Sequence, residues 1–179
     1  DPRRGACTRP RVLLARVGAW DEARWRRVAP MVRWQIVLER PALAEAAALA
    51  SPRRVDRVLD LGTGTAGMLE QLAQTADPPQ FAVGVDSSQE MLAHAVQLPR
   101  SWQLLCADAY ELPFADNSFD LATMAYLLHV IPAANRRALL SEVARVLTRR
   151  GRLVVVTPAR PRSLLGRALF APLAWRAER

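Results

Sequence analysis

The sequence predicts an α/β fold in which a parallel β-sheet carries helices on both faces. Short apolar strands alternate with helical segments from Val55 onward, and this alternation is typical of right-handed βαβ units. A glycine-rich turn follows the first predicted strand, and acidic residues lie at the carboxyl ends of the first three strands. Ligands of such sheets bind at the carboxyl ends of the strands. We therefore expect the glycines and the acids to surround one crevice.

The first part of the chain, residues 1–52, is expected to form a helical N-terminal cap. A segment rich in Trp and Arg has mostly helical spacing. The stretch PALAEAAALA, from Pro41 to Ala50, favours a helix because alanine has the highest helix propensity and proline suits a first turn. Residues 53–179 form the second predicted domain.

Residues 53–179 are predicted to contain five strands and four helices, assigned from apolar runs, helical spacing and Pro/Gly breaks. The strands are expected at residues 57–61, 81–85, 102–106, 119–125 and 153–157. The helices are expected at residues 66–75, 87–97, 134–147 and 164–176. Ser87 and Glu90 have the spacing of a capping box, which predicts the start of the second of these helices.

The turn after the first strand carries the strongest functional motif. In the stretch VLDLGTGTAG, Gly62, Gly64 and Gly67 have the spacing G-x-G-x-x-G. This spacing lets the backbone approach a nucleotide closely and directs helix N-terminal amides toward it. Several classes of nucleotide-binding protein share the motif, so the glycines alone do not identify the nucleotide.

Three acids at successive strand ends, Asp60, Asp86 and Asp108, indicate the charge of the ligand. Asp86 follows Gly62 by 24 residues, near the spacing at which a carboxylate binds ribose hydroxyls. A dinucleotide would place an anionic pyrophosphate beside Asp60, which would repel it. A sulfonium ligand without phosphate suits the acids better. Helix capping and surface turns are the alternative roles, and we favour ligand binding because the acids recur at successive strands.

The charge of the chain is unevenly distributed. The net charge is +8, and all 25 basic residues are Arg. Residues 1–57 hold 13 Arg against 6 acids, residues 58–135 hold one Arg against 9 acids, and residues 136–179 hold 11 Arg against 2 acids. We interpret the excess positive charge as solvated Arg side chains on outer helices, and we do not expect a nucleic-acid partner. RNA and peripheral contact with a membrane surface remain the alternatives for the basic ends.

The cysteines and histidines favour a reducing compartment and argue against a metal site. Cys7 and Cys106 are the only cysteines, and the chain has two His. Neither a disulfide nor a metal-ligand spacing is predicted. We therefore expect a cytoplasmic protein. No apolar run is long enough to span a bilayer.

Five motifs, in this order, resemble those of class I S-adenosylmethionine-dependent methyltransferases. They are VLDLGTGTAG (58–67), GVDSSQEML (84–92), CADAYELPFADNSFD (106–120), LLHVIP (127–132) and EVARVLTRRGRLVVVTP (142–158). The group they resemble most comprises the ubiquinone and menaquinone C-methyltransferases, of methyltransferase type 11. The resemblance covers about residues 55–158. It implies a Rossmann-like doubly wound sheet of strand order 3-2-1-4-5, with S-adenosylmethionine as cofactor.

On the methionine side of this cofactor, the resemblance implies roles for the glycine turn and for the end of the fourth strand. Asp60, Gly62, Thr63 and Gly64 would hold the methionine portion. Residues 124–127 would line the methionine and the methyl acceptor.

On the adenosine side, the resemblance implies roles for the ends of the second and third strands. Asp86 would bind the ribose hydroxyls, with Ser87 and Met91 near the adenine. Asp108 would meet the adenine amino group, and Ala109 would offer its backbone.

Two departures from the family pattern are visible. Ala66 stands where the family usually has Gly, and a methyl group there is expected either to be tolerated or to crowd the turn. The family also closes its sheet with two further strands, one of them antiparallel. Only 22 residues follow Thr157, and they read as helix. We therefore expect a C-terminally truncated domain or an unusually short sheet, without strands six and seven.

The predicted function is in-line methyl transfer from S-adenosylmethionine to a small or lipophilic molecule. The methyl group is already activated, so alignment and desolvation would supply most of the catalysis. His129 and Tyr126 follow the fourth strand and are candidate catalytic residues, with a structural or lid role as the alternative. The alternative functions are an NAD-binding oxidoreductase, an RNA-directed methyltransferase, and a non-catalytic or fragmentary nucleotide-binding protein.

Overall fold

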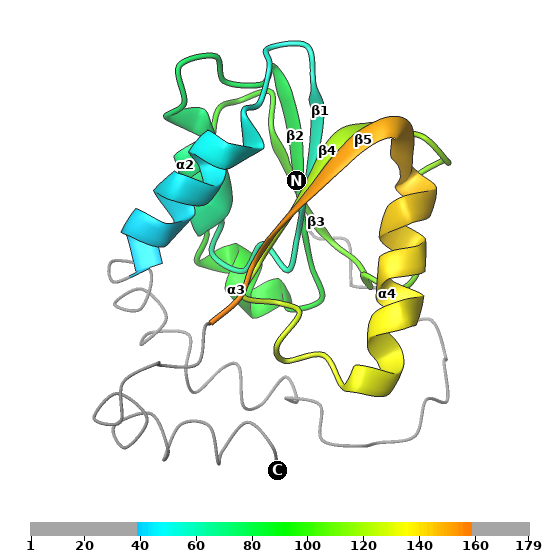
Figure 1. Ribbon diagram of the computed structural model, residues 1–179. Coiled ribbons are helices and arrows are strands. Elements are labelled where there is room, and N and C mark those ends of the chain that lie inside the picture. Colours follow the sequence, from blue (N-terminus) through cyan, green and yellow to red (C-terminus); the bar gives the residue numbers. More distant parts are fainter. Residues whose placement is uncertain (1–38, 159–179) are drawn as a thin grey trace, which may run out of the picture.

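The computed structural model describes residues 39–158, which form a single five-stranded sheet flanked by helices (Figure 1). The strand order is β3-β2-β1-β4-β5, and every neighbouring pair is parallel, as predicted. The strands are β1 (Arg57–Leu61), β2 (Phe81–Asp86), β3 (Gln103–Cys106), β4 (Phe119–Ala125) and β5 (Leu147–Val156). The helices are residues 39–50, α2 (Gly67–Ala73), α3 (Gln89–Ala93) and α4 (Ala133–Val146).

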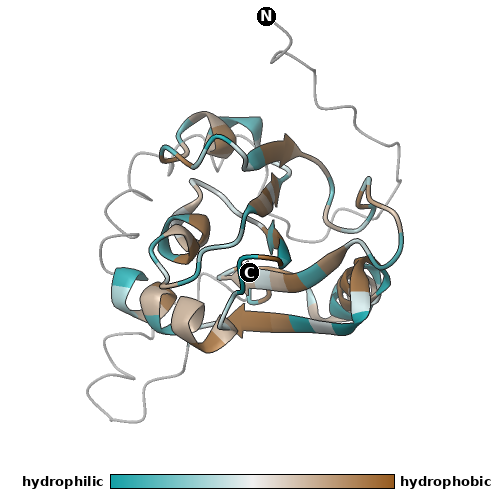
Figure 2. Cartoon of the chain, turned by 90° about the horizontal axis from the view of Figure 1, so that it is seen from above, coloured by the Kyte–Doolittle hydropathy of each residue, from teal (hydrophilic) through white to brown (hydrophobic). Residues whose placement is uncertain are grey.

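Two apolar clusters cover the two faces of the sheet, as a doubly wound fold requires. The residues of β1 alternate between them: Val58 belongs to one cluster and Leu59 to the other. Helix 39–50 and α2 complete the first cluster, and α4 completes the second (Figure 1). The central strands β1, β2 and β4 are buried along most of their length, as expected for strands covered on both faces. Brown segments mark the apolar stretches of the chain (Figure 2).

Part of the sequence-based prediction lies outside the described residues. This holds for most of the N-terminal cap (residues 1–38) and for the helix expected at residues 164–176. Helix 39–50 contains the predicted segment from Pro41 to Ala50. No helix within residues 39–158 has the length and apolar character needed to cross a bilayer.

The second predicted helix, placed at residues 87–97, is wrong in its start and its length. The N-cap is Ser88, whose hydroxyl accepts a hydrogen bond from the backbone N–H of Met91, so Ser87 is not the cap. The helix α3 ends at Ala93. The chain after α3 instead contacts the glycine turn, because the N–H of Val96 donates a hydrogen bond to the carbonyl of Thr65.

The last strand, β5, begins at Leu147, six residues before the predicted start at Leu153. Leu147 is extended directly after α4 and aligns with Phe119 of β4. The register then shifts, and Arg152 aligns with Leu121. Residues 148–151, which lie between the predicted helix and the predicted strand, therefore form a bulge within β5.

The centre of the sheet leaves no room for a side chain at Gly84 of β2. A Cβ atom there would lie 2.7 Å from Thr63 Oγ1 and 2.9 Å from Leu69 Cδ1. Thr63 belongs to the glycine turn and Leu69 to α2. The absence of a side chain at Gly84 thus lets the turn and α2 pack directly onto the sheet.

We predict that Gly84→Ala lowers the free energy of unfolding by about 1–3 kcal/mol, because the added methyl group overpacks this contact. Urea denaturation of the wild type and the variant measures the change. A difference below roughly 0.5 kcal/mol would contradict the packing described here.

Candidate cofactor site

The glycine turn between β1 and α2 adopts left-handed backbone conformations at three positions. The φ angles are +64° at Gly62, +54° at Gly64 and +68° at Ala66. Glycine takes such angles without steric cost. The N–H of Thr63 donates to the carbonyl of Val85, so the turn is also fixed to the end of β2.

Ala66 is the N-cap of α2 and has a left-handed backbone conformation. This conformation explains why glycine would suit the position. A left-handed conformation costs a residue with a Cβ atom about 1–2 kcal/mol. The side chain of Ala66 is fully buried in the first apolar cluster, and burial of one methyl group returns about 0.8 kcal/mol. The chain therefore tolerates the methyl group at a modest cost in strain.

The carboxylate of Asp60, the fourth residue of β1, lies beneath the turn with both oxygens engaged. Oδ2 accepts a hydrogen bond of 2.7 Å from the hydroxyl of Thr63, and Oδ1 accepts one of 2.7 Å from the hydroxyl of Thr123. Thr123 lies on β4, directly beside Asp60 in the register. Asp60 is 1% exposed. It therefore ties β1, β4 and the glycine turn together.

The pKa of Asp60 is raised to about 6, chiefly because burial penalises the charged form. The hydrogen bonds from Thr123 and Thr63 oppose this rise, and the charge of Asp86 adds to it. Asp60 is therefore ionised at pH 7 at an energetic cost. Its negative charge lies directly under the backbone of the turn.

Asp86, the last residue of β2, joins the turn to the start of α3. Oδ2 accepts a hydrogen bond from the N–H of Gly64 and Oδ1 accepts one from the N–H of Ser88, both 2.8 Å. Burial raises the pKa of Asp86, and these two bonds oppose the rise. A carboxylate has about four acceptor positions, so two remain for a ligand.

Asp108 begins a tight turn that follows β3. Oδ1 accepts a hydrogen bond from the N–H of Tyr110, and the Asp108 carbonyl accepts one from the N–H of Glu111. The N–H of Ala107 donates to the carbonyl of Asp86. This bond brings the partly exposed Asp108 and Ala109 to the same edge of the sheet as Asp86.

Two apolar side chains pack against the glycines of the turn. Leu127 lies against Gly62, and Met91 lies against Gly64. Of the residues predicted from sequence, the structure thus gathers the turn, Asp86, Met91 and Leu127 in one place. Ser87 lies beside them but is exposed, and its carbonyl faces the thiol of Cys106 at 3.6 Å.

Tyr126 and His129 lie at the carboxyl end of the sheet, after β4. Their rings meet edge to face at 6.4 Å between centroids. Burial, and then the charge of Glu39, raises the pKa of Tyr126, so its phenol is neutral at pH 7. Desolvation, and then the charge of Arg136, lowers the pKa of His129. The His129 imidazole is therefore neutral at pH 7 and able to accept a proton.

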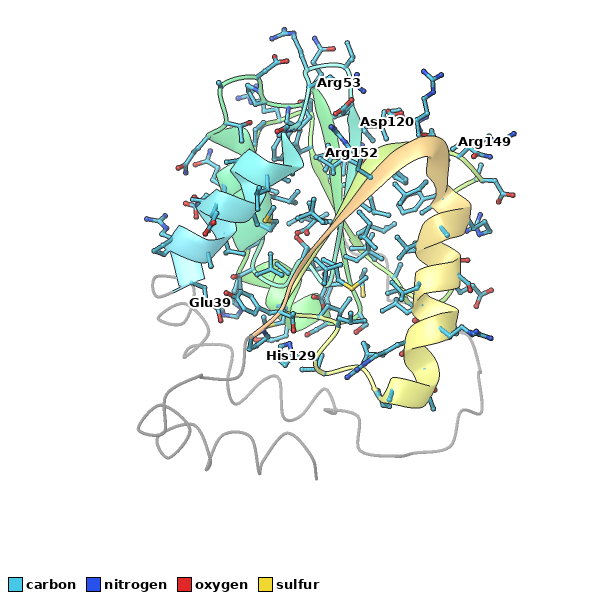
Figure 3. All side chains as sticks on the ribbon, in the orientation of Figure 1. Glu39, Arg53, Asp120, His129, Arg149 and Arg152 are labelled. Atoms are coloured by element: carbon cyan, nitrogen blue, oxygen red, sulfur yellow. The ribbon has the colours of Figure 1, made fainter. Side chains whose placement is uncertain are left out.

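Three arginines, Arg53, Arg149 and Arg152, lie away from this edge. Figure 3 shows Arg53, Arg149 and Arg152 near the amino ends of the strands, opposite His129 and Glu39. The guanidinium groups of Arg53 and Arg152 both pair with the buried Asp56. These arginines thus lie at the opposite end of the sheet from the carboxyl edge that carries Asp60 and Asp86.

Two threonines of this region, Thr65 and Thr123, were not predicted from the sequence as site residues. Thr123 is a polar residue within the apolar strand FDLATMA, a pattern that could have marked it as a partner for a buried polar group. The Thr65 side chain is buried, and among residues 39–158 its hydroxyl is the one buried side-chain polar atom without a hydrogen-bond partner. No group of His, Cys, Asp and Glu in this same range could hold a metal ion.

Comparison with known proteins places the chain in a family. Residues 58–151 match the model of a methyltransferase domain, which is more than half of the chain. The demethylmenaquinone methyltransferase of Thermotoga maritima is 40% identical over 101 residues, which cover 56% of this chain and 43% of that protein. The chain therefore spans less than half the length of this curated relative.

Solved structures agree with the sequence comparison. A putative methyltransferase of Haloferax volcanii, solved in complex with the Trm112 methyltransferase activator, has a TM-score of 0.64 and 26% identity, covering 75% of this chain and 58% of that chain. An S-adenosylmethionine-dependent methyltransferase of Mesorhizobium loti has a TM-score of 0.51 and 29% identity, covering 66% and 53%. With its sheet order and its matching domain model, this chain belongs to the methyltransferase domain family.

Proposed function

We propose that this chain binds S-adenosylmethionine at the carboxyl edge of its sheet and transfers the methyl group to a small, lipophilic acceptor. The observation that carries the proposal is the pair of carboxylates, Asp60 and Asp86, around the glycine turn. Among the ion pairs of residues 39–158, none involves either acid. An uncompensated negative site favours a cationic ligand and disfavours a pyrophosphate.

The groups around the turn fit the parts of such a ligand. Asp86 keeps acceptor positions for two ribose hydroxyls beside its bonds to Gly64 and Ser88. Asp108 is an acceptor for the adenine amino group. The Thr65 hydroxyl lies buried in the turn without a partner, and a ligand or a bound water would satisfy it.

When bound, S-adenosylmethionine supplies a methyl group already activated by a positive sulfur. The chain then has to align the acceptor with the sulfur–methyl bond and exclude water. The half-buried Leu127, Leu128 and Ile131 follow β4 and offer an apolar wall for the acceptor. An acceptor that gains a methyl group loses a proton, and in this proposal the neutral imidazole of His129 accepts it.

The acceptor class is suggested by the relatives. The Thermotoga maritima relative is named for demethylmenaquinone, a lipophilic quinone. A reduced quinone ring is the acceptor that we propose for this chain as well. Asp60 disfavours an NAD-dependent oxidoreductase. The anionic pyrophosphate of NAD would lie beside a carboxylate whose charged form is already destabilised by burial, and the two negative charges would repel.

We predict that Asp86→Ala weakens binding of S-adenosylmethionine at least about tenfold, because two hydrogen bonds from ribose hydroxyls to a carboxylate are lost. Glu111→Ala removes an exposed acid nearby and is expected to leave the affinity unchanged. Calorimetric titration measures both variants, with thermal unfolding as a check that Asp86→Ala remains folded. Equal affinity of the wild type and Asp86→Ala, or tighter binding of NAD than of S-adenosylmethionine, would refute the assignment.

We predict that Asp60→Asn stabilises the ligand-free protein at pH 8 and weakens S-adenosylmethionine binding. The amide keeps an acceptor for one threonine and a donor for the other, but removes the buried charge. The rise of the Asp60 pKa from 3.8 to about 6 corresponds to a penalty of roughly 3 kcal/mol at most. Because the folded pKa exceeds the unfolded one, this penalty grows between about pH 4 and pH 6 and is constant above.

The stabilisation by Asp60→Asn should therefore shrink as the pH falls from 6 to 4. Urea denaturation at pH 4.5, 6 and 8 measures it, with the exposed Asp77→Asn as the control. A wild type as stable as Asp60→Asn at pH 8 would contradict the account of Asp60.

We predict that His129→Gln lowers kcat by about 100-fold and leaves the KM for S-adenosylmethionine nearly unchanged, because a proton acceptor is lost rather than a binding group. The wild-type rate should rise with pH through a pKa below 6.5. Transfer of labelled methyl groups to a reduced demethylated naphthoquinone measures the kinetic constants and their dependence on pH. An unchanged kcat would assign His129 a structural role.

A further inference from the structure

The turn that carries Asp108 is held at both of its ends. On the upstream side, the N–H of Ala107 donates to the carbonyl of Asp86 at 3.1 Å. On the downstream side, both backbone groups of Leu112 bind α4. Its N–H donates to Glu142 Oε1 at 2.7 Å, and its carbonyl accepts from Arg145 Nη2 at 3.1 Å. Only the four residues 108–111 lie between these two fixed points.

Arg145 is the centre of the downstream attachment. Its Nε and Nη2 donate to the two oxygens of Glu142 at 2.9 and 2.7 Å. Its Nη1 donates to the carbonyl of Phe114 and to Asp116 Oδ1, both at 2.8 Å. One side chain thus joins the last turn of α4 to three positions of the loop between β3 and β4.

The Glu142–Arg145 pair is less exposed than an ordinary surface ion pair and makes more hydrogen bonds. The Arg145 side chain is 33% exposed and that of Glu142 15% exposed. The bond from Arg145 lowers the pKa of Glu142 more than any other contact, so the carboxylate stays ionised. The guanidinium fork bonds to backbone carbonyls as well as to carboxylates, a geometry that a lysine ammonium does not reproduce. The pair therefore fixes the position of the backbone.

We infer that Glu142 and Arg145 are positioning residues for the cofactor site, setting the position of Asp108 through Leu112. The inference rests on the proposed function, in which Asp108 accepts a hydrogen bond from the adenine amino group. Releasing one end of a four-residue turn would let the Asp108 carboxylate move. A displacement of about 1 Å is enough to lose a directed hydrogen bond. The preference for a ligand with the adenine amino group over one without it would then fall, although neither Glu142 nor Arg145 would touch the ligand.

The experiment compares two ligands that differ only at that amino group. These are S-adenosylhomocysteine and its 6-deamino counterpart, in which a hydrogen atom replaces the amino group of the purine ring. The variants are Arg145→Lys and Glu142→Gln, and the matched control is Arg137→Lys, an exposed arginine on the same helix. Calorimetry gives the ratio of the two affinities for each protein. Amide hydrogen exchange of residues 107–118 gives the mobility of the turn without a ligand.

The wild type and Arg137→Lys should prefer the adenine ligand by about 10- to 100-fold, the range for one hydrogen bond to a charged group. Arg145→Lys should reduce this preference to below about threefold, and Glu142→Gln should reduce it partially. Exchange should accelerate at Tyr110 and Glu111 as well as at Leu112. These amides are those that close the Asp108 turn and its downstream attachment.

A purely structural role would lower the unfolding temperature and weaken both ligands equally. An unchanged affinity ratio in Arg145→Lys and Glu142→Gln would therefore overturn the inference, as would acceleration confined to residues 112–118. If the wild type bound neither ligand, the proposed function itself would fail. That outcome is distinguishable because it would affect the wild type and the control equally.

Discussion

The buried carboxylate of Asp60 is the constraint on which the cofactor site depends. It lies on the central strand of the sheet and accepts hydrogen bonds from Thr63 in the glycine turn and Thr123 on β4. Through these two bonds the turn is fixed to the sheet. The N–H of Gly64, held by Asp86, fixes the other side of the same turn. The turn is therefore preorganised before any ligand binds.

Preorganisation of this kind lowers stability. Asp60 is ionised against a strong desolvation penalty, and Asp86 adds like charge beside it. Ala66 contributes backbone strain in the same turn. Functional sites commonly hold such unfavourable features, which the surrounding packing sustains. Here, the two apolar clusters on either face of the sheet provide that packing.

The sequence was sufficient to predict what depends on local pattern. Strands β1 and β4 have the predicted bounds, and the acids Asp60, Asp86 and Asp108 lie at successive strand ends. Features that depend on tertiary contacts were not predicted. The chain after α3 leaves the helix because Val96 binds the glycine turn, and β5 starts early because Leu147 aligns with Phe119. Thr123 and Arg145 acquire their roles only through the sheet register and the docking of α4.

The most direct test of this account is the pKa of Asp60, measured by carbon NMR of its carboxyl group with and without ligand. We predict a pKa of about 6 for Asp60 in the ligand-free protein. The cationic S-adenosylmethionine should lower this pKa, and more than the product S-adenosylhomocysteine does, because the product lacks the sulfonium charge. An ordinary pKa near 3.8 without ligand, or a pKa unmoved by S-adenosylmethionine, would contradict the claim that this buried charge serves a cationic cofactor.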